Sequence, residues 1–312
     1  MSRLTMGKLF VIGNGFDLDL GFSTRYSDFA NCAQLWPFKS ETEGLAGYLN
    51  KKKDTEKWLD IEQCLFEYAR IKPRVRSLNS DDRMPVEKDH EDFCKLTQNL
   101  NYYIKRVPPQ QPINTDSVAA QVIAAIAENG GFKAYSFNYT DLDRVTEKLK
   151  VPRIDCIHVH GSVKNDSIIL GIDDAQDVYE GYEFLYKVFD PQYRSNMLRN
   201  ELEEAEEVVF FGHSLGEIDY TYFRSFFKNI CREENTIHDR KTVTIFTYDE
   251  SSRLAILRQL REMNEKKMGL MFNNNDFRII RTSECGYHDK PLLDEFIKHI
   301  HETTAVSIGS AF

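Results

Sequence analysis

Short runs of hydrophobic residues alternate with amphipathic stretches along most of the chain. Residues 9–12 form the first run and Gly13-Asn14-Gly15 follows it directly, which predicts a buried strand ending in a tight turn. Six more strands are predicted on the same pattern, at residues 133–137, 153–159, 167–171, 208–211, 242–248 and 277–281. Runs with little alternation are typical of strands covered on both faces, as in a parallel sheet.

Helical spacing of apolar positions fills most of the intervals between these runs. Residues 118–128 predict a helix that ends at Gly130-Gly131, and residues 16–30 predict a helix or a loop followed by a helix. Further helices are predicted at residues 142–150, 193–204, 251–263 and 292–300, and in the stretch that ends at Cys231. Strands joined by helices predict an α/β fold with a mostly parallel sheet flanked by helices.

Residues 36–111 differ from the rest because they contain no convincing strand. Their aromatic and aliphatic residues follow helical spacing, with a polar, charged loop near residues 73–90 and Pro108-Pro109 at the end of the block. We therefore predict a helical insertion at residues 36–111, after the first strand–helix unit. The α/β core would consist of residues 1–35 and 112–312.

Composition narrows the class of protein. The chain has 312 residues, 41% of them hydrophobic, and a formal net charge of −9, which is typical of a globular protein and disfavours nucleic acid as a partner. The longest uncharged apolar stretch, residues 117–127, is shorter than the roughly 20 residues that cross a bilayer. We see no secretory signal, and the six scattered cysteines include no CxxC pair. These features predict a cytoplasmic protein with reduced thiols, no membrane partner and no zinc site.

Polar residues follow several predicted strands, where parallel sheets bind their ligands. The first such segment is Gly13-Asn14-Gly15, whose N–H groups and short helix start suit a phosphate. Leu18 stands where the dinucleotide fingerprint needs its third glycine, and no second strand follows soon enough to carry an acidic ribose ligand. An ordinary Rossmann dehydrogenase is therefore not predicted, and a tight turn without a ligand is the alternative.

A second segment resembles the nucleophile elbow of serine hydrolases. Gly212-His-Ser214-Leu-Gly216 follows a hydrophobic strand, and Asp249 and His288 come later in the order that a triad requires. Against this, no upstream oxyanion segment is present, and Glu217 and Asp219 would oppose a developing oxyanion. We favour a turn in which Ser214 supplies a donor to a ligand, and keep the hydrolase as an alternative.

Two further strand ends carry candidate chemistry. His158 and His160 would share one face of a continuing strand, but the spacing supplies no third ligand for zinc. His160 precedes Gly161 at a strand end, which suits an exposed general base; a structural histidine is the alternative. The amide of Asn138 suits a ribose hydroxyl or a water, and a helix N-cap is its alternative role.

Together and in this order, these segments resemble the bacteriophage abortive-infection AbiH family. The matching sequences are LFVIGNGFDLDLGFSTRYSDF at residues 9–29, WLDIE at 58–62, FNYTD at 137–141, HVHGS at 158–162, ILGID at 169–173 and FGHSLGEIDYTYF at 211–223. The resemblance implies a protein that acts in antiviral defence by abortive infection.

The family in turn looks distantly similar to the sirtuin-like fold, which binds NAD on a Rossmann-like sheet. Gly13-Asn14-Gly15 matches the glycine-rich first turn, Asn138 the central residue of a T-x-N-x-D segment, His160-Gly161 the catalytic pair, and residues 212–215 a G-x-S-L turn. Thr140 stands where aspartate is usual, and the zinc-ribbon cysteines of deacylases are absent. The similarity therefore implies an NAD glycohydrolase rather than a deacylase.

This similarity also implies roles for single residues, with NAD as the substrate and no metal. His160 would be the general base, and Asn138 would hold a ribose hydroxyl or the attacking water. The residues implied in NAD binding are Gly13, Asn14, Gly15, Asp17, Thr24, Gly161, Gly212, Ser214 and Asp219. Assembly into a homo-oligomer or a phage-derived trigger would switch on such an enzyme. A non-catalytic module that senses nucleotides or binds a partner is a third hypothesis.

Overall fold

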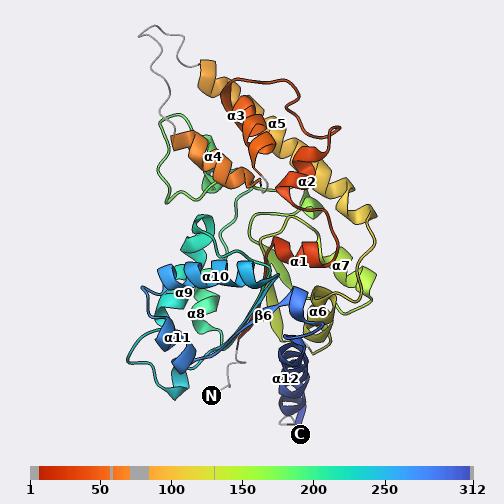
Figure 1. The fold of residues 1–312 in the computed structure, drawn as a ribbon, viewed down its shortest axis with the longest axis vertical. Coiled ribbons are helices and arrows are strands. Elements are labelled where there is room, and N and C mark those ends of the chain that lie inside the picture. The colour runs from red at the N-terminus through yellow and green to blue at the C-terminus, as the bar shows by residue number, and fades with distance from the viewer. Residues whose placement is uncertain (1–6, 57–58, 71–83, 130, 310–312) are drawn as a thin grey trace. The chain divides into compact units, whose positions relative to one another are not determined.

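A computed structural model describes residues 7–56, 59–70, 84–129 and 131–309 of the protein (Figure 1). The chain divides into two compact units. The first consists of Met1–Phe22, Pro112–Val159 and Ser195–Phe312, and the second of Ser23–Gln111 and His160–Arg194.

The first unit contains a six-stranded sheet in which every pairing is parallel. Its strands are β1 (Lys8–Ile12), β2 (Phe132–Ser136), β3 (Cys156–His158), β4 (Glu207–Phe211), β5 (Thr242–Thr247) and β6 (Asp276–Arg281). They lie in the order β3-β2-β1-β4-β5-β6, the order of doubly wound dinucleotide-binding folds. The predicted mostly parallel sheet is confirmed.

Alternate residues of the central strands point to opposite faces of this sheet. In β1, Phe10 and Ile12 join one hydrophobic cluster, whereas Leu9 and Val11 join the other. Helices cover both clusters, which is why residues 9–12 of β1 are all apolar instead of alternating.

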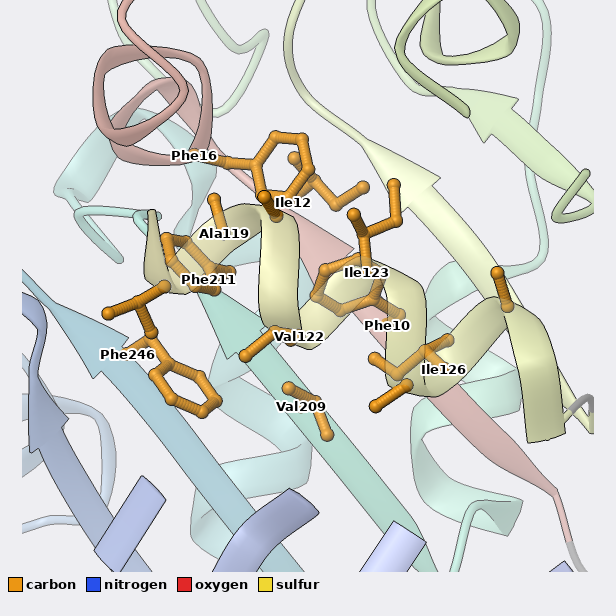
Figure 2. Close-up of a cluster of buried hydrophobic side chains, with 14 of the residues drawn as sticks. Phe10, Ile12, Phe16, Ala119, Val122, Ile123, Ile126, Val209, Phe211 and Phe246 are labelled. Atoms are coloured by element: carbon orange, nitrogen blue, oxygen red, sulfur yellow. The ribbon is translucent and has the colours of Figure 1, made fainter. Parts of the chain in front are cut away.

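Helices cover both faces of the sheet (Figure 1). Those packed on one face are α1 (Asn14–Asp19), α6 (Val118–Asn129), α7 (Leu142–Leu149) and α12 (Lys290–Gly309). Those on the other face are α8 (Leu198–Glu204), α9 (Tyr220–Asn229), α10 (Glu250–Met263) and α11 (Met268–Asn274). Figure 2 shows α6 lying across the sheet, with Val122 and Ile123 against side chains of β1 and β4.

Among its described residues, the second unit contains four α-helices that lie between β1 and β2 in the chain, which confirms the predicted helical insertion after β1. Its helices are α2 (Tyr26–Asn31), α3 (Gly44–Thr55), α4 (Ile61–Arg70) and α5 (Met84–Arg106). Asp89 of α5 is buried and joins these elements: its carboxylate accepts hydrogen bonds from the Leu45 N–H (2.7 Å), the Tyr68 hydroxyl (2.8 Å) and the Tyr182 hydroxyl (2.7 Å). These three hydrogen bonds offset part of the cost of burying this carboxylate.

The predicted strand at residues 167–171 is wrong. This segment is buried at Ile168, Ile169 and Leu170, but it pairs with no strand among the described residues. The N–H of Ile169 donates instead to the carbonyl of His160, 2.8 Å away, within the same loop. The apolar residues of this segment indicate that it is buried, but burial alone does not show that a segment pairs with a neighbouring strand.

Several predicted boundaries also differ from the structure. The third strand covers only Cys156–His158, and the helix expected from residue 193 begins at Leu198. Helix α11 was not predicted, and α12 is longer than residues 292–300. Of the expected loop at residues 73–90, the last seven residues belong to α5, and residues 73–83, like Trp58, lie outside the described residues.

Candidate functional site

The turns that follow β1 and β4 are in direct backbone contact. The N–H of Gly13 donates to the carbonyl of Phe211 and that of Gly15 to the carbonyl of Gly212, both at 2.9 Å. A Cβ atom on Gly15 would lie 2.6 Å from the Cα of Gly212, and one on Gly212, whose φ is +64°, would lie 2.4 Å from the Cα of Gly15. This contact therefore requires glycine at both positions.

The same hydrogen bonds change the expected role of the first turn. The sequence predicts that the N–H groups of Gly13 and Gly15 bind a phosphate, but in this structure they donate to the carbonyl groups of Phe211 and Gly212. The glycines of this turn serve the close approach of two strand ends. A ligand here would have to use other donors.

Asp17 lies in α1, beside the end of β2, and is buried. The Thr140 hydroxyl donates to its Oδ2 at 2.8 Å, and the Asn138 side chain is its other hydrogen-bond partner. Burial raises the pKa of Asp17 from 3.8 to about 7, and these two hydrogen bonds offset only part of that effect. Both partners are uncharged, so Asp17 is a carboxyl that changes protonation near neutral pH.

Asn138 is also buried and bridges two strand ends. Its Nδ2 donates to the carbonyl of Gly13 at 3.1 Å. Asp141 is the N-cap of α7, because its carboxylate accepts from the Asp143 N–H, so the alternative role of Asn138 as helix cap is excluded. Within the described part of the chain, we find no hydrogen bond to Oδ1 of Asn138, which makes this atom an acceptor for a bound hydroxyl or water.

His158 ends β3 and contacts the same residue. Its Nδ1 lies 3.1 Å from the backbone carbonyl of Asn138. A carbonyl oxygen only accepts hydrogen bonds, so the proton of a neutral His158 is on Nδ1 and the lone pair is on Nε2. The first unit thus holds a connected set of polar groups at the carboxyl ends of β1, β2 and β3: Asp17, Thr140, Asn138 and His158.

The turn after β4 is fixed by His213. The N–H of Leu215 donates to its Nδ1 at 2.9 Å, which puts the proton of the neutral ring on Nε2, 3.4 Å from Oδ2 of Asp219. The rings of Phe137 and Phe223 pack edge-on against the imidazole. Asp219, predicted to bind NAD, therefore holds this turn in shape.

The structure does not assemble the hydrolase triad that the GHSLG sequence suggests. Ser214 is exposed, and its hydroxyl accepts a hydrogen bond from the Gly216 N–H at 3.3 Å. Asp249 is the N-cap of α10 and accepts from the N–H and the hydroxyl of Ser252, both at 2.8 Å. A carboxylate occupied in this way does not orient a histidine base.

The remaining predicted residues, Thr24, His160 and Gly161, belong to the second unit. His160 is buried, and its Nε2 lies 3.3 Å from Nζ of Lys187. Gly161 has a φ of +75°, and a Cβ atom there would lie 1.6 Å from the Ser167 carbonyl oxygen, so the turn after His160 requires glycine.

Among the predicted residues, the first unit holds Gly13, Asn14, Gly15, Asp17, Asn138, Gly212, Ser214 and Asp219. Three side chains near the predicted residues were not predicted: Thr140, whose hydroxyl donates to Asp17, Lys187, whose Nζ lies 3.3 Å from His160, and Glu62, which pairs with Lys187. Glu62 had a signal, because it ends the WLDIE segment, whereas nothing in the sequence around Lys187 marks it.

Two further properties concern the described residues as a whole. No group of three His, Cys, Asp or Glu side chains among them is arranged to hold a metal ion. None of their helices is both long enough and apolar enough to cross a membrane.

The strand order and the polar turns at the strand ends define the class: a doubly wound, parallel α/β protein with a helical insertion after its first strand. The family model described as Bacteriophage abortive infection AbiH matches residues 9–239. This is well over half of the chain, and the protein belongs to that family. No curated protein matches its sequence.

Proposed function

We propose that this AbiH protein stops phage propagation by hydrolysing NAD at the bond between nicotinamide and ribose. Membership of an abortive-infection family supports a role in which the infected cell loses an essential metabolite. The strand order supports a nucleotide as the ligand, because sheets wound in this order bind dinucleotides beyond the carboxyl ends of their strands.

The observation that carries the proposal is the polar network of Asp17, Thr140 and Asn138 at the ends of β1 and β2. Two strand ends fix the Asn138 amide, and Oδ1 remains to accept a hydrogen bond from a ribose hydroxyl or a water. A fixed acceptor of this kind orients a reactant without a large entropic cost during the reaction. We assign Asn138 this orienting role.

In the proposed reaction, the bond from C1′ of the ribose to the nicotinamide nitrogen breaks, and its electron pair neutralises the pyridinium ring. The oxygen of a water then bonds to C1′, and the proton that it loses goes to a general base, for which we propose His160. The products are nicotinamide and ADP-ribose. Because the transition state resembles an oxocarbenium ion, positioning and charge stabilisation contribute more than a strong nucleophile.

We assign the binding of NAD to the turn at residues 13–15 and to Asp17, Thr24, Gly161, Gly212, Ser214 and Asp219. In this assignment the glycines of the β1 and β4 turns shape the two strand ends, and other groups donate to the ligand, since the N–H groups of Gly13 and Gly15 are used inside the protein. We also propose that a phage-derived trigger, or assembly with further copies of the chain, switches on the activity.

The test is mass spectrometry of NAD, nicotinamide and ADP-ribose in phage-infected cells that produce the protein. We expect NAD loss with the wild type and at least roughly a hundredfold slower loss with Asn138→Ala or His160→Gln. Asn273→Ala and His238→Gln are matched controls, because both residues are exposed, and they should leave the loss unchanged. Intact NAD in infected cells that are protected by the wild type would refute the proposal, and tight NAD binding without turnover would favour a sensor.

A further inference from the structure

Three ionisable side chains lie close together in the second unit, the buried Lys187 and His160 and the partly buried Glu62. Nζ of Lys187 lies 3.0 Å from Oε1 and 3.1 Å from Oε2 of Glu62, and 3.3 Å from Nε2 of His160. The side chain of Lys187 is only 7% exposed and that of Glu62 only 14%. Lysine is almost never buried to this extent unless it is paired, so this cluster is a built feature.

The backbone holds Lys187 in place. Its N–H donates to the carbonyl of Ile172, and the Ile172 N–H donates to the carbonyl of Leu185, both at 2.9 Å. Gly171, which directly precedes Ile172, has a φ of +149°, and a Cβ atom on it would lie 2.2 Å from the carbonyl oxygen of Leu185. Only glycine allows the two segments to approach so closely.

Glu62, the other member of the ion pair, is positioned by a different element. It lies in the first turn of α4 (Ile61–Arg70), and its Oε1 also accepts a long hydrogen bond, 3.4 Å, from the Gly171 N–H. The ion pair therefore joins α4 to the segment around Lys187. The position of the ammonium group beside His160 is set by a carboxylate as well as by the backbone.

The chemistry of these groups fixes the state of the imidazole. An ammonium group has three N–H donors and no lone pair, so Nε2 of His160 must be the acceptor of this contact. The proton of the neutral ring then resides on Nδ1. As long as Lys187 keeps this place, the lone pair with which His160 would take up a proton is occupied.

We propose that Lys187 and Glu62 are positioning residues for His160: they select its Nδ1–H tautomer and mask its Nε2 until Lys187 moves away. This inference rests on the proposed function only in giving His160 a catalytic task. It explains how a hydrolase of an essential metabolite is kept inactive in an uninfected cell, because the base is present but blocked by an ion pair inside its own unit.

The first experiment reads the tautomer directly and does not depend on NAD hydrolysis. The full-length wild-type protein, labelled with ¹⁵N-histidine, is studied by imidazole ¹⁵N–¹H correlation spectroscopy, and His160→Gln identifies the signals. We expect a protonated Nδ1 and an unprotonated, hydrogen-bonded Nε2. A protonated Nε2 in the wild type would overturn the proposal, whether or not the protein hydrolyses NAD.

The second experiment removes the ion pair without leaving one charge buried. Glu62→Gln and Lys187→Met are combined, since each single variant would leave an unpaired charge and risk unfolding. We expect the His160 tautomer to change and NAD hydrolysis in uninfected cells to rise about tenfold, which a further His160→Gln substitution abolishes. An unchanged tautomer in the folded double variant would overturn the positioning role. A changed tautomer without this rise would overturn the masking role.

Discussion

Two acidic side chains, Asp17 of the first unit and Glu62 of the second, have opposite surroundings. In the first unit, Asp17 is surrounded by uncharged donors, the Thr140 hydroxyl and the Asn138 amide, and its pKa rises to about 7. In the second unit, Glu62 faces the ammonium group of Lys187 at 3.0 Å. Burial alone therefore does not determine the charge of a carboxyl group in this protein. The charge of its partner does, because only an opposite charge compensates the lost hydration of a carboxylate in full.

The units also differ in what positions these groups. In the first unit, glycines bring two strand ends into contact, and Asn138 is tied to one of them through the Gly13 carbonyl. In the second unit, an ion pair between side chains joins α4 to the segment around Lys187. A methyl group added at one of these glycines should therefore destabilise the first unit. Removal of the charge of Lys187 should destabilise the second unit.

The largest effect is expected from Gly212→Ala. The new methyl group would lie 2.4 Å from two backbone atoms, and the residue would keep a left-handed φ of +64°. Strain and overpacking together should lower the free energy of unfolding by about 4–6 kcal/mol. Denaturant unfolding measures this change. Gly269→Ala is the control: it is an exposed helical site with no atom within 4 Å of the new Cβ, and the free energy should rise by about 0.5–1 kcal/mol. A Gly212→Ala protein as stable as the wild type would contradict the backbone contact.

A smaller effect is expected from Lys187→Met in the second unit. This substitution leaves the carboxylate of Glu62 buried without its ammonium partner, and it should cost about 3–5 kcal/mol of unfolding free energy. Adding Glu62→Gln should recover much of this loss. The control is Lys105→Met, which breaks an exposed pair with Asp166 in the same unit and should leave the unfolding midpoint unchanged. Equal losses from the two lysine substitutions would mean that burial does not distinguish the pairs.

The next prediction concerns how the stability of the protein depends on pH through Asp17. Because the folded-state pKa of Asp17, about 7, lies above the ordinary aspartate pKa of 3.8, the native protein binds a proton that the unfolded chain has released. This contribution is present at low pH and is lost as the pH rises toward neutrality, by about 2 kcal/mol between pH 5 and pH 7. In Asp17→Asn, this part of the decrease should vanish.

Unfolding titrations of the wild type and the variant at several pH values measure the difference. Thr140→Val sharpens the test, because losing the hydroxyl removes a hydrogen bond that lowers the Asp17 pKa, so the decrease should extend to higher pH. The same pH dependence in the wild type and Asp17→Asn would show that Asp17 is ionised throughout this range.

The sequence allowed most of the sheet to be predicted, because the β1 and β4 segments are apolar on both faces and end at glycine or polar residues. It failed at residues 167–171, where an equally apolar segment is buried in a loop. Hydrophobicity along the chain reports whether a segment is buried. Pairing depends on a neighbouring strand that is distant in sequence.

The candidate site was predictable to the extent that it follows strand ends. Asn138 and Asp17, which follow neighbouring strands of the sheet, are in one hydrogen-bonded network. The role of Gly13 was not predictable. Whether its N–H donates to a ligand or to the Phe211 carbonyl depends on how closely the end of β4 approaches the turn after β1. The partnership of Lys187 with Glu62 spans 125 positions, so no local spacing could reveal it.

The smallest effect is expected from Ser214→Ala, in the turn after β4. Ser214 is exposed and its hydroxyl accepts only from a nearby N–H, so its removal should change the free energy of unfolding by less than about 0.5 kcal/mol. NAD hydrolysis should persist, because Ser214 is proposed to line the ligand and not to attack it. A fluorophosphonate probe should label neither the wild type nor the variant, since the Asp249 carboxylate caps α10 and does not orient a base. If the probe labels the wild type but not Ser214→Ala, this assignment is wrong and the β4 turn is a nucleophile elbow. The reacting site would then be Ser214, and not the network around Asp17.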